Sequence, residues 1–84
     1  MNKKTIWITD ASTGIGKALA IKFAENGWNV AASARRENLL KELNDINENI
    51  HSYPLDVNKI DDCKSTAQQI IKKLGQIDIC VFGT

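Results

Sequence analysis

The sequence has little of what marks secreted, membrane or metal-binding proteins. Its 84 residues include two cysteines, Cys63 and Cys80, too far apart for a disulfide framework and without a His or second Cys at zinc-ligand spacing. We expect both to be thiols of the core. Behind a basic amino terminus the apolar stretch ends at Asp10, too soon for a signal-peptide core or a membrane span. These absences predict a cytoplasmic protein with no membrane partner.

The charge balance removes another class of partner. A net charge of +1 gives no reason to expect binding to nucleic acid or to an anionic surface. The 43% hydrophobic and 25% charged composition is typical of a soluble globular protein. We find no internal repeat, low-complexity tract or linker, so residues 1–84 are predicted to form a single domain.

The hydrophobic pattern alternates between strand and helix along the chain. Short apolar runs predict strands at 5–9, 28–34, within 50–57 and at 77–82, and helical spacing predicts a helix between each pair. Gly27 is expected to end the first helix and Asn58 to cap the third. The apolar stripes are Ile15, Ala18, Leu19 and Phe23, then Leu39, Leu43, Ile46 and Ile50, then Ile60, Cys63, Ala67, Ile70, Ile71 and Leu74.

This βαβαβαβ order predicts an α/β fold, a Rossmann-like three-layer arrangement around a parallel sheet with right-handed crossovers. The strand order that fits best is 3-2-1-4, that of a dinucleotide-binding half. Pro54 interrupts the third strand. Since proline removes a ladder donor, that strand is expected at an edge of the sheet.

The segment Thr5–Ala20 places a glycine-bearing turn between a strand and a helix. Amides of a first helical turn point outward, the helix dipole favours negative charge there, and Gly14 and Gly16 allow a phosphate to approach the backbone. The segment is not a nucleoside-triphosphate P-loop. The first glycine of that motif would be Ala11, and its magnesium-binding hydroxyl would be at Ala18.

The end of the second predicted strand bears on which dinucleotide would bind. An acidic residue there selects NAD by accepting hydrogen bonds from the ribose, but this chain has Ala34-Arg35-Arg36. Guanidinium groups pair with a 2′-phosphate through charge-assisted hydrogen bonds. The sequence therefore favours NADP over NAD. The alternative is that both arginines are solvated residues opening a helix.

Together these motifs resemble the amino-terminal, NAD(P)-binding segment of the short-chain dehydrogenase/reductase family, whose first strand and turn read Thr-Gly-x-x-x-Gly-x-Gly. The resemblance covers essentially the whole chain, although the family's first glycine is Asp10 here. Leu55-Asp56-Val57 resembles the family motif in which the aspartate bonds the adenine amino group and the next side chain packs on the ring. A turn or capping role is the alternative for Asp56. The resemblance implies cofactor contacts from Asp10, Ser12, Thr13, Gly14, Ile15, Gly16, Arg35, Arg36, Asp56 and Val57.

The resemblance also implies an activity, hydride transfer between a nicotinamide and a carbonyl or alcohol. The family's serine, tyrosine and lysine would lie beyond residue 84, and Tyr53 has Val57 rather than lysine four residues on, so we expect no catalytic residue or metal ligand here. Phe82-Gly83-Thr84 replaces the family's Asn-Asn-Ala-Gly, and the chain is expected to be a truncated half of the full domain. The last strand would then leave an open edge, which predicts self-association. The alternative function is a non-catalytic interaction or regulatory module that has lost cofactor binding.

Overall fold

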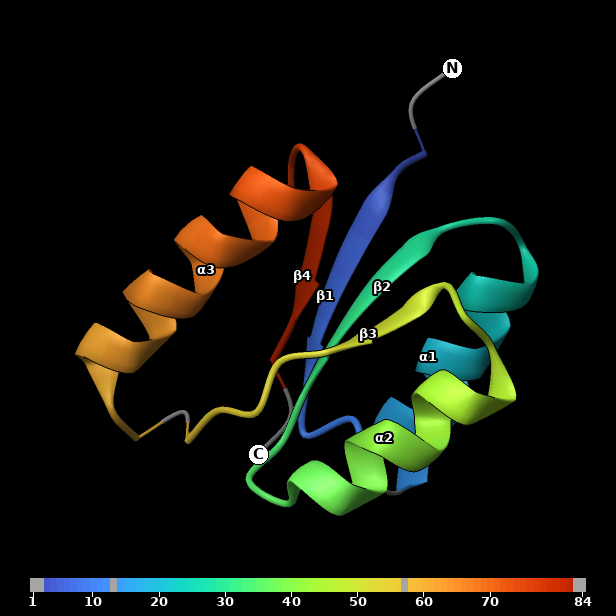
Figure 1. Ribbon diagram of the computed structural model, residues 1–84, viewed down its shortest axis with the longest axis horizontal. Helices are drawn as coiled ribbons and strands as arrows, with labels where there is room; N and C mark the ends of the chain where they lie inside the picture. Colours follow the sequence, from blue (N-terminus) through green and yellow to red (C-terminus); the bar gives the residue numbers. More distant parts are fainter. Residues whose placement is uncertain (1–2, 13, 57, 83–84) are drawn as a thin grey trace.

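Four parallel strands form one sheet in the order β3-β2-β1-β4, as the sequence predicts (Figure 1). The computed structural model describes residues 3–12, 14–56 and 58–82. The strands are β1 (Thr5–Thr9), β2 (Asn29–Ser33), β3 (Ile50–Ser52) and β4 (Ile79–Val81), and the helices are α1 (Gly14–Glu25), α2 (Glu37–Ile46) and α3 (Ile60–Leu74). This is the predicted Rossmann-like α/β fold, with the predicted bounds of β1 confirmed.

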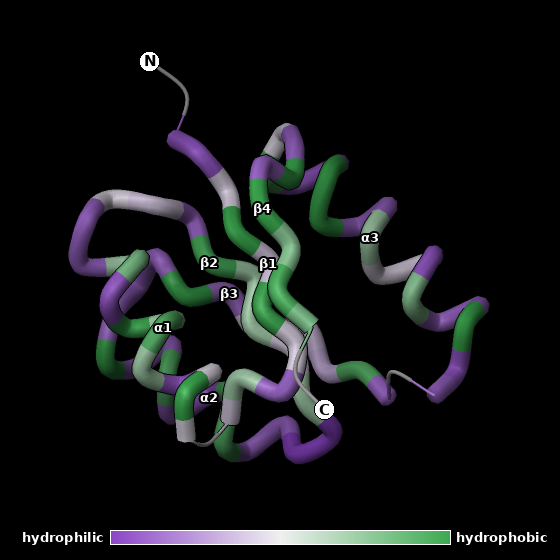
Figure 2. The backbone as a smooth tube through the Cα atoms, turned by 180° about the vertical axis from the view of Figure 1, so that it is seen from behind, coloured by the Kyte–Doolittle hydropathy of each residue, from purple (hydrophilic) through white to green (hydrophobic). Residues whose placement is uncertain are grey.

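The helices form two unequal layers around the sheet. Figures 1 and 2 show α1 and α2 on one face and α3 alone on the other. The first face buries the larger core, which includes Ile6 and Ile8 of β1 together with Leu40, Leu43 and Ile50. On the second face the buried side chains include Trp7, Leu55 and Ile70. Alternation along β1 produces this division, because successive side chains of a strand point to opposite faces.

A buried side-chain hydrogen bond joins β1 to β2 under α3. The indole Nε1 of Trp7 donates to the Oγ of Ser33 at 2.9 Å, and the two residues are 4% and 0% exposed. Tryptophan has one polar group, and burying it without an acceptor would cost the energy of its lost hydration. Ser33 thereby allows Trp7 to fill the core beneath α3.

The start of β4 is tied to the start of β1 through Asp78. The Thr5 amide donates to Oδ2 of Asp78 at 2.7 Å, and the Asp78 amide donates to the Thr5 carbonyl at 2.8 Å. Regular pairing begins only after this clamp, so β4 spans Ile79–Val81 rather than the predicted 77–82. β2 is likewise shorter than predicted, at Asn29–Ser33.

The predicted stripe of the second helix is partly wrong. Leu40 and Leu43 are buried, whereas Leu39 is half-buried and Ile46 is 55% exposed. Ile50 is fully buried, but in β3. The helix ends at Ile46, and Asn47 has an extended backbone. Ile50 therefore shares the helical spacing of the stripe without belonging to the helix.

Three further expectations for the carboxyl-terminal half are corrected. The cap position of α3 is Lys59 rather than Asn58, and Lys59 makes no side-chain capping bond. Ile60 is 71% and Ile71 is 48% exposed, so the inward stripe of α3 is narrower than its apolar pattern. Cys80 is exposed rather than part of the core, because β4 is an edge strand, whereas Cys63 is half-buried.

Both edges of the sheet match their sequence patterns. β3 is an edge strand, as expected, but it ends at Ser52, so Pro54 lies two residues beyond the strand rather than interrupting it. At the other edge β4 carries the exposed side chains Ile79 and Cys80, and Phe82 beyond it is 65% exposed. Among the described residues, none of the helices combines the length and the apolar character that crossing a membrane requires.

Candidate functional site

The turns that follow β1, β2 and β3 lie at one edge of the sheet, because the strands are parallel and their carboxyl ends point the same way (Figure 1). In open parallel sheets this edge is where ligands bind. The predicted site residues lie in these turns. Thr13 and Val57 were also predicted to contact a cofactor, but both lie outside the described residues.

The turn after β1 depends on backbone shapes that few side chains adopt. Asp10 has φ 56° and is the one non-glycine residue with positive φ in the described parts of the chain, and Gly14 has φ 60°. Aspartate tolerates this left-handed region better than most residues, so Asp10 can occupy a glycine position of the resembling motif. The Ala11 amide then donates to the Ser33 carbonyl at 3.0 Å, which holds the turn beside the end of β2.

Gly16 allows α1 to pack directly on this turn. A Cβ placed on Gly16 would collide with the carbonyl oxygen of Asp10 and come within 3.1 Å of the Ala11 Cα. Both contacts are with backbone, which cannot move aside as a flexible side chain can. The first turn of α1 is therefore held close to the end of β1 by the absence of a side chain at position 16.

The amino end of α1 has the properties of an anion-binding end. Its first turn contains no acidic residue. The side chain of Ile15 is 80% exposed there, a large apolar surface turned to solvent between two glycines. Lys17 is exposed on the helix surface, as expected from its failure to fit a P-loop. Ser12, half-buried in the preceding turn, adds a hydroxyl group to this end.

The end of β2 adds positive charge to the same edge. Arg35 and Arg36 are exposed, and within the described residues neither guanidinium forms an ion pair. Together with Asp10, Ser12, Ala34 and Leu39 they line a hollow of about 630 Å³, which we call the β2 hollow. Leu39 was assigned to the core by its spacing. Its half-buried place in the hollow could have been found by setting the helical register on Leu40 instead.

The turn after β3 adjoins this hollow through Arg35. The Leu55 amide donates to the Ala34 carbonyl at 3.0 Å, which extends the β2–β3 pairing past the last strand residue. Oδ1 of Asp56 accepts a hydrogen bond from the Asn58 amide at 3.0 Å, so the turn role foreseen as an alternative for Asp56 is present. Arg35, Leu55 and Asp56 border a second hollow of about 520 Å³. One arginine thus lies between the two hollows.

No catalytic constellation accompanies these turns in the described part of the chain. His51 and Tyr53 lie on and just after β3 and line a separate hollow at its outer edge. Burial raises the pKa of the Tyr53 hydroxyl, which makes it a poorer proton donor at neutral pH. Among the described residues no group of His, Cys, Asp or Glu is arranged to hold a metal ion.

Comparison with known proteins identifies the family. The family model described as short chain dehydrogenase matches residues 4–84. The chain belongs to the short chain dehydrogenase family. It is 39% identical to a dehydrogenase/reductase SDR family protein 7-like from Dictyostelium discoideum over 89 residues, which cover 95% of this chain and 28% of that protein. It is 37% identical over 82 residues to the 3-oxoacyl-(acyl-carrier-protein) reductase FabG of Buchnera aphidicola, covering 96% of this chain and 34% of the relative.

Solved structures of short chain dehydrogenases share this architecture. A short chain dehydrogenase from Bacillus anthracis matches with a TM-score of 0.90 and 33% identity, over 96% of this chain and 34% of that one. A 3-ketoacyl-(acyl-carrier-protein) reductase from Brucella melitensis, complexed with NADH, matches with a TM-score of 0.86 and 25% identity over 94% of this chain and 33% of that one. This short chain dehydrogenase sequence therefore spans about a third of the length of these relatives.

Proposed function

We propose that this chain forms the part of an NADP(H)-dependent short-chain oxidoreductase that binds the adenosine and pyrophosphate of the cofactor. The observation that carries the proposal is the pair Arg35 and Arg36, which border the β2 hollow directly after Ala34, where a NAD-selecting acidic residue would stand. A carboxylate at this place would repel a 2′-phosphate, and guanidinium groups attract one.

The described residues fit such a cofactor at three points. A Cβ at Gly16 would collide with the Asp10 carbonyl oxygen, so α1 begins directly against the β1 turn, and we propose that its first amides face the pyrophosphate. Ser12 would donate its hydroxyl there, and exposed Ile15 offers an apolar surface to a ring. We propose Gly14 and the undescribed Thr13 as further members of this turn site.

The adenine would lie over the turn after β3. Among the described residues, the Asn58 amide bonds Oδ1 of Asp56, and none of them bonds Oδ2. We propose that Oδ2 accepts the adenine amino group and that Val57, which is not described, packs against the ring. Arg35 would lie between adenine and the 2′-phosphate, since it borders both hollows.

Asp10 is the residue that least suits this function. Its exposed carboxylate lines the β2 hollow beside the arginines and follows directly after β1. Negative charge near a pyrophosphate weakens binding, although Arg35 and Arg36 offset part of it. We therefore propose that Asp10 contacts the cofactor region and lowers its affinity.

When bound, the cofactor would supply hydride transfer between its nicotinamide and a carbonyl or alcohol. We propose that the residues of this chain hold and select the cofactor and that the proton-transfer groups are supplied from elsewhere, since Tyr53 lacks a lysine four residues on. The test is titration of the purified chain with NADPH and NADH, followed by nicotinamide fluorescence. Saturable binding with NADPH preferred supports the proposal, and no binding of either cofactor overturns it for this chain.

A second candidate function is a non-catalytic interaction module, favoured by the open edge of β4. Ile79 is 41% exposed, and Phe82 packs on Trp7 at a ring-centroid distance of 6.1 Å while remaining 65% exposed. We propose a second copy of the chain as the partner, because two identical edges pair antiparallel across a two-fold axis. Analytical ultracentrifugation tests this. A dimer that dissociates on Ile79→Lys supports it, and a monomer at all concentrations contradicts it.

A further inference from the structure

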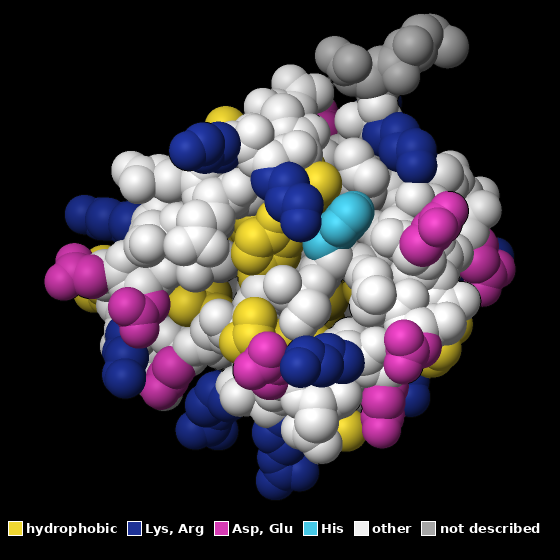
Figure 3. All heavy atoms as spheres, viewed as in Figure 1, with side chains coloured by type: hydrophobic (Ala, Val, Ile, Leu, Met, Phe, Trp, Pro, Cys, Tyr) yellow, Lys and Arg dark blue, Asp and Glu magenta, His cyan; other side chains and the backbone are white. Residues whose placement is uncertain are grey.

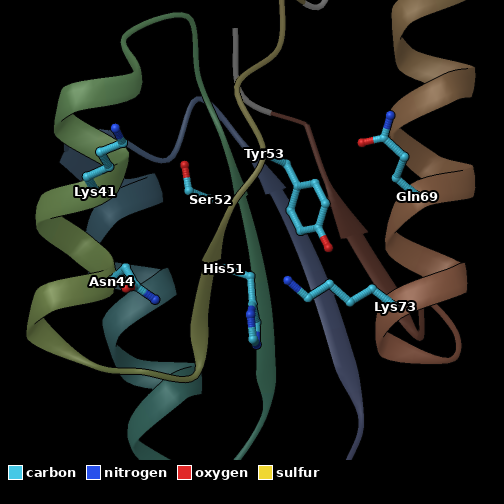
Figure 4. A pocket seen from close by; sticks show the side chains of 7 residues that line it. All are labelled: Lys41, Asn44, His51, Ser52, Tyr53, Gln69 and Lys73. Atoms are coloured by element: carbon cyan, nitrogen blue, oxygen red, sulfur yellow. The ribbon is translucent and has the colours of Figure 1, made fainter.

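A hollow of about 470 Å³, the β3 hollow, lies at the outer edge of β3 between α2 and α3. Figure 4 shows how it wraps around the strand: Lys41 and Asn44 of α2 face Ser52 on one side, and Lys73 of α3 extends toward His51 and Tyr53 on the other. None of the residues proposed for the cofactor lines this hollow. Its volume falls in the range of small-molecule sites, about 300–1,000 Å³.

Two hydroxyl groups in the β3 hollow have no protein partner. The Oγ of Ser52 and the Oη of Tyr53 are buried and make no hydrogen bond to any described residue. Nearly all buried polar atoms of folded proteins are paired with protein, water or ligand, so each such atom requires an explanation. The two side chains point to opposite sides of β3, Ser52 toward α2 and Tyr53 toward α3, so each hydroxyl can donate only to an acceptor on its own side (Figure 4).

The backbone of β3 offers one further donor but little room for another strand. The Tyr53 amide donates to the Ala32 carbonyl at 2.9 Å, so by alternation the amide of Ser52 points outward from the sheet. The Ile50 amide is already bonded to the Asn47 carbonyl at 3.0 Å, and the Ile50 carbonyl accepts from Nδ2 of Asn44 at 2.6 Å. An added peptide strand would find its partners occupied, whereas a compact acceptor could bind Ser52.

The charge around the β3 hollow is positive. None of the described residues that line it is Asp or Glu, while Lys41 and Lys73 stand on its two sides. Lys41 has only a 3.7 Å contact with Glu37, and both side chains are more than half exposed. Lys73 also lines an adjoining hollow with Lys3 and Lys72. Figure 3 shows the histidine near the middle of this face with a basic side chain beside it.

We propose that the β3 hollow binds a small phosphate-bearing molecule, held at the edge of the strand by the ammonium groups of Lys41 and Lys73 and by the Ser52 amide, with the hydroxyl of Ser52 as a further donor on the α2 side (Figure 4). Lysine is a compact charge that suits phosphate, and oxyanions accept the hydrogen bonds that the amide and the hydroxyl can donate. The site lies on a different edge of the sheet from the cofactor turns, so it would be occupied independently of NADP(H).

Titration of the full chain with inorganic pyrophosphate at constant ionic strength tests this site. The chain has one histidine, so the ring proton resonances of His51 report on the hollow without ambiguity. We expect saturable shifts of these resonances and of the Ser52 and Tyr53 amides. The double variant Lys41→Gln, Lys73→Gln should weaken pyrophosphate binding at least tenfold, and Ser52→Ala should weaken it severalfold. Citrate as the probe in a parallel titration distinguishes phosphate from carboxylate recognition.

The matched control is Lys22→Gln, Lys64→Gln, which removes the same charge from lysines that do not line the hollow. Equal weakening by both double variants would show unspecific attraction and overturn the proposal, as would shifts that do not saturate or citrate binding as tight as pyrophosphate. NADPH serves to separate the two sites: it should shift resonances of Arg35 and Gly14 while pyrophosphate still shifts His51. If NADPH displaces pyrophosphate from the β3 hollow, as reported by His51, the two sites are not independent. This holds whatever the affinity of NADPH for the cofactor turns.

Discussion

The backbone of Asp10 and the missing side chain of Gly16 are in direct apposition: a Cβ on Gly16 would collide with the Asp10 carbonyl oxygen. Asp10 has φ 56°, and its carbonyl oxygen faces α1 at the end of β1. The strand and the helix therefore meet backbone to backbone. In this fold, such close approach is what brings helical amides to the edge where a phosphate would bind.

Gly16→Ala is expected to destabilise the chain by about 1–3 kcal/mol, the usual cost of overpacking, because α1 must move away from the β1 turn. Gly14→Ala is the matched comparison. A Cβ at position 14 would meet no atom within 4 Å, but the backbone there has φ 60°. This substitution should therefore cost only the energy of holding alanine in a left-handed conformation, about 1–2 kcal/mol. Urea unfolding measures both. A Gly16→Ala variant as stable as the parent would show that the helix shifts freely.

Replacing Arg35 and Arg36 by alanine should weaken NADPH binding about tenfold or more, as expected for lost charge-assisted hydrogen bonds of about 1.5–3 kcal/mol. Binding of NADH should change much less, because NADH lacks the 2′-phosphate. Fluorescence titration of both cofactors measures the ratio of affinities. Lys64→Ala, which removes an exposed positive charge elsewhere, serves as control. Parallel losses for NADH and NADPH would refute a role in phosphate selection.

Asp10→Gly should tighten NADPH binding about fivefold, corresponding to about 1 kcal/mol for an exposed charge. Glycine accepts the positive φ of this position without cost, so the turn should keep its shape. Asp10→Asn separates charge from shape, since it keeps the side-chain size and tolerates the same backbone. If both variants bind as weakly as the parent or more weakly, the carboxylate does not limit affinity.

Ser33→Ala should lower the free energy of unfolding by about 1–3 kcal/mol, because it leaves the buried indole N–H of Trp7 without its acceptor. Ser65→Ala, an exposed position on α3, makes the same chemical change with little expected effect. A double-mutant cycle with Trp7→Phe isolates the pair. If Ser33→Ala costs the same in the Trp7→Phe background, the hydrogen bond contributes nothing and the loss has another origin.

The stability of the chain should fall as the solution is made acidic below the unfolded pKa of His51, about 6.5. Burial, followed by the charges of Lys73 and Lys3, lowers the pKa of His51 in the folded chain. Between this lowered value and the unfolded value of about 6.5, the unfolded chain binds more protons, so the free energy of unfolding decreases as pH decreases across that window. Below the folded pKa the effect ends, because both states are then protonated.

An NMR titration of the His51 ring measures this pKa directly, and urea unfolding across the window measures the stability change. His51→Gln should remove the part of the pH dependence that belongs to His51, and Lys73→Gln should raise the pKa of His51. A pKa at or above 6.5 in the parent chain would refute the prediction.

The strand order could be predicted from the sequence because the features that indicate it act locally. These features are the hydrophobic periodicity, the glycine positions and one proline. The uncharged run at β1 and the glycine after α1 act through the residues themselves, and Gly27 indeed has positive φ, at 85°. Helix faces were less predictable. Ile46 and Ile60 fit the apolar spacing and are nevertheless exposed, because a helix buries only the side that meets another layer, and that is set by the ends of neighbouring elements.

The candidate site shows the same division. Gly14, Gly16, Arg35 and Asp56 could be selected as candidates from motifs, since the role proposed for each rests on its own chemistry and its place after a strand. The bond from the Asn58 amide to Asp56 could not be chosen from the sequence, where capping by Asn58 and a turn at Asp56 were both open. Only the geometry of the turn decides which side chain reaches which amide.

By itself the sequence determined the α/β class, the parallel order and the glycine turn, because these depend on local backbone preferences and on alternation along the chain. Only the tertiary structure decided that Gly16 faces the Asp10 carbonyl, that Arg35 borders two hollows, and that Ser52 and Tyr53 have no partner in the described chain. These relationships join residues from different elements. Their distances are set by how layers pack, which no single segment encodes.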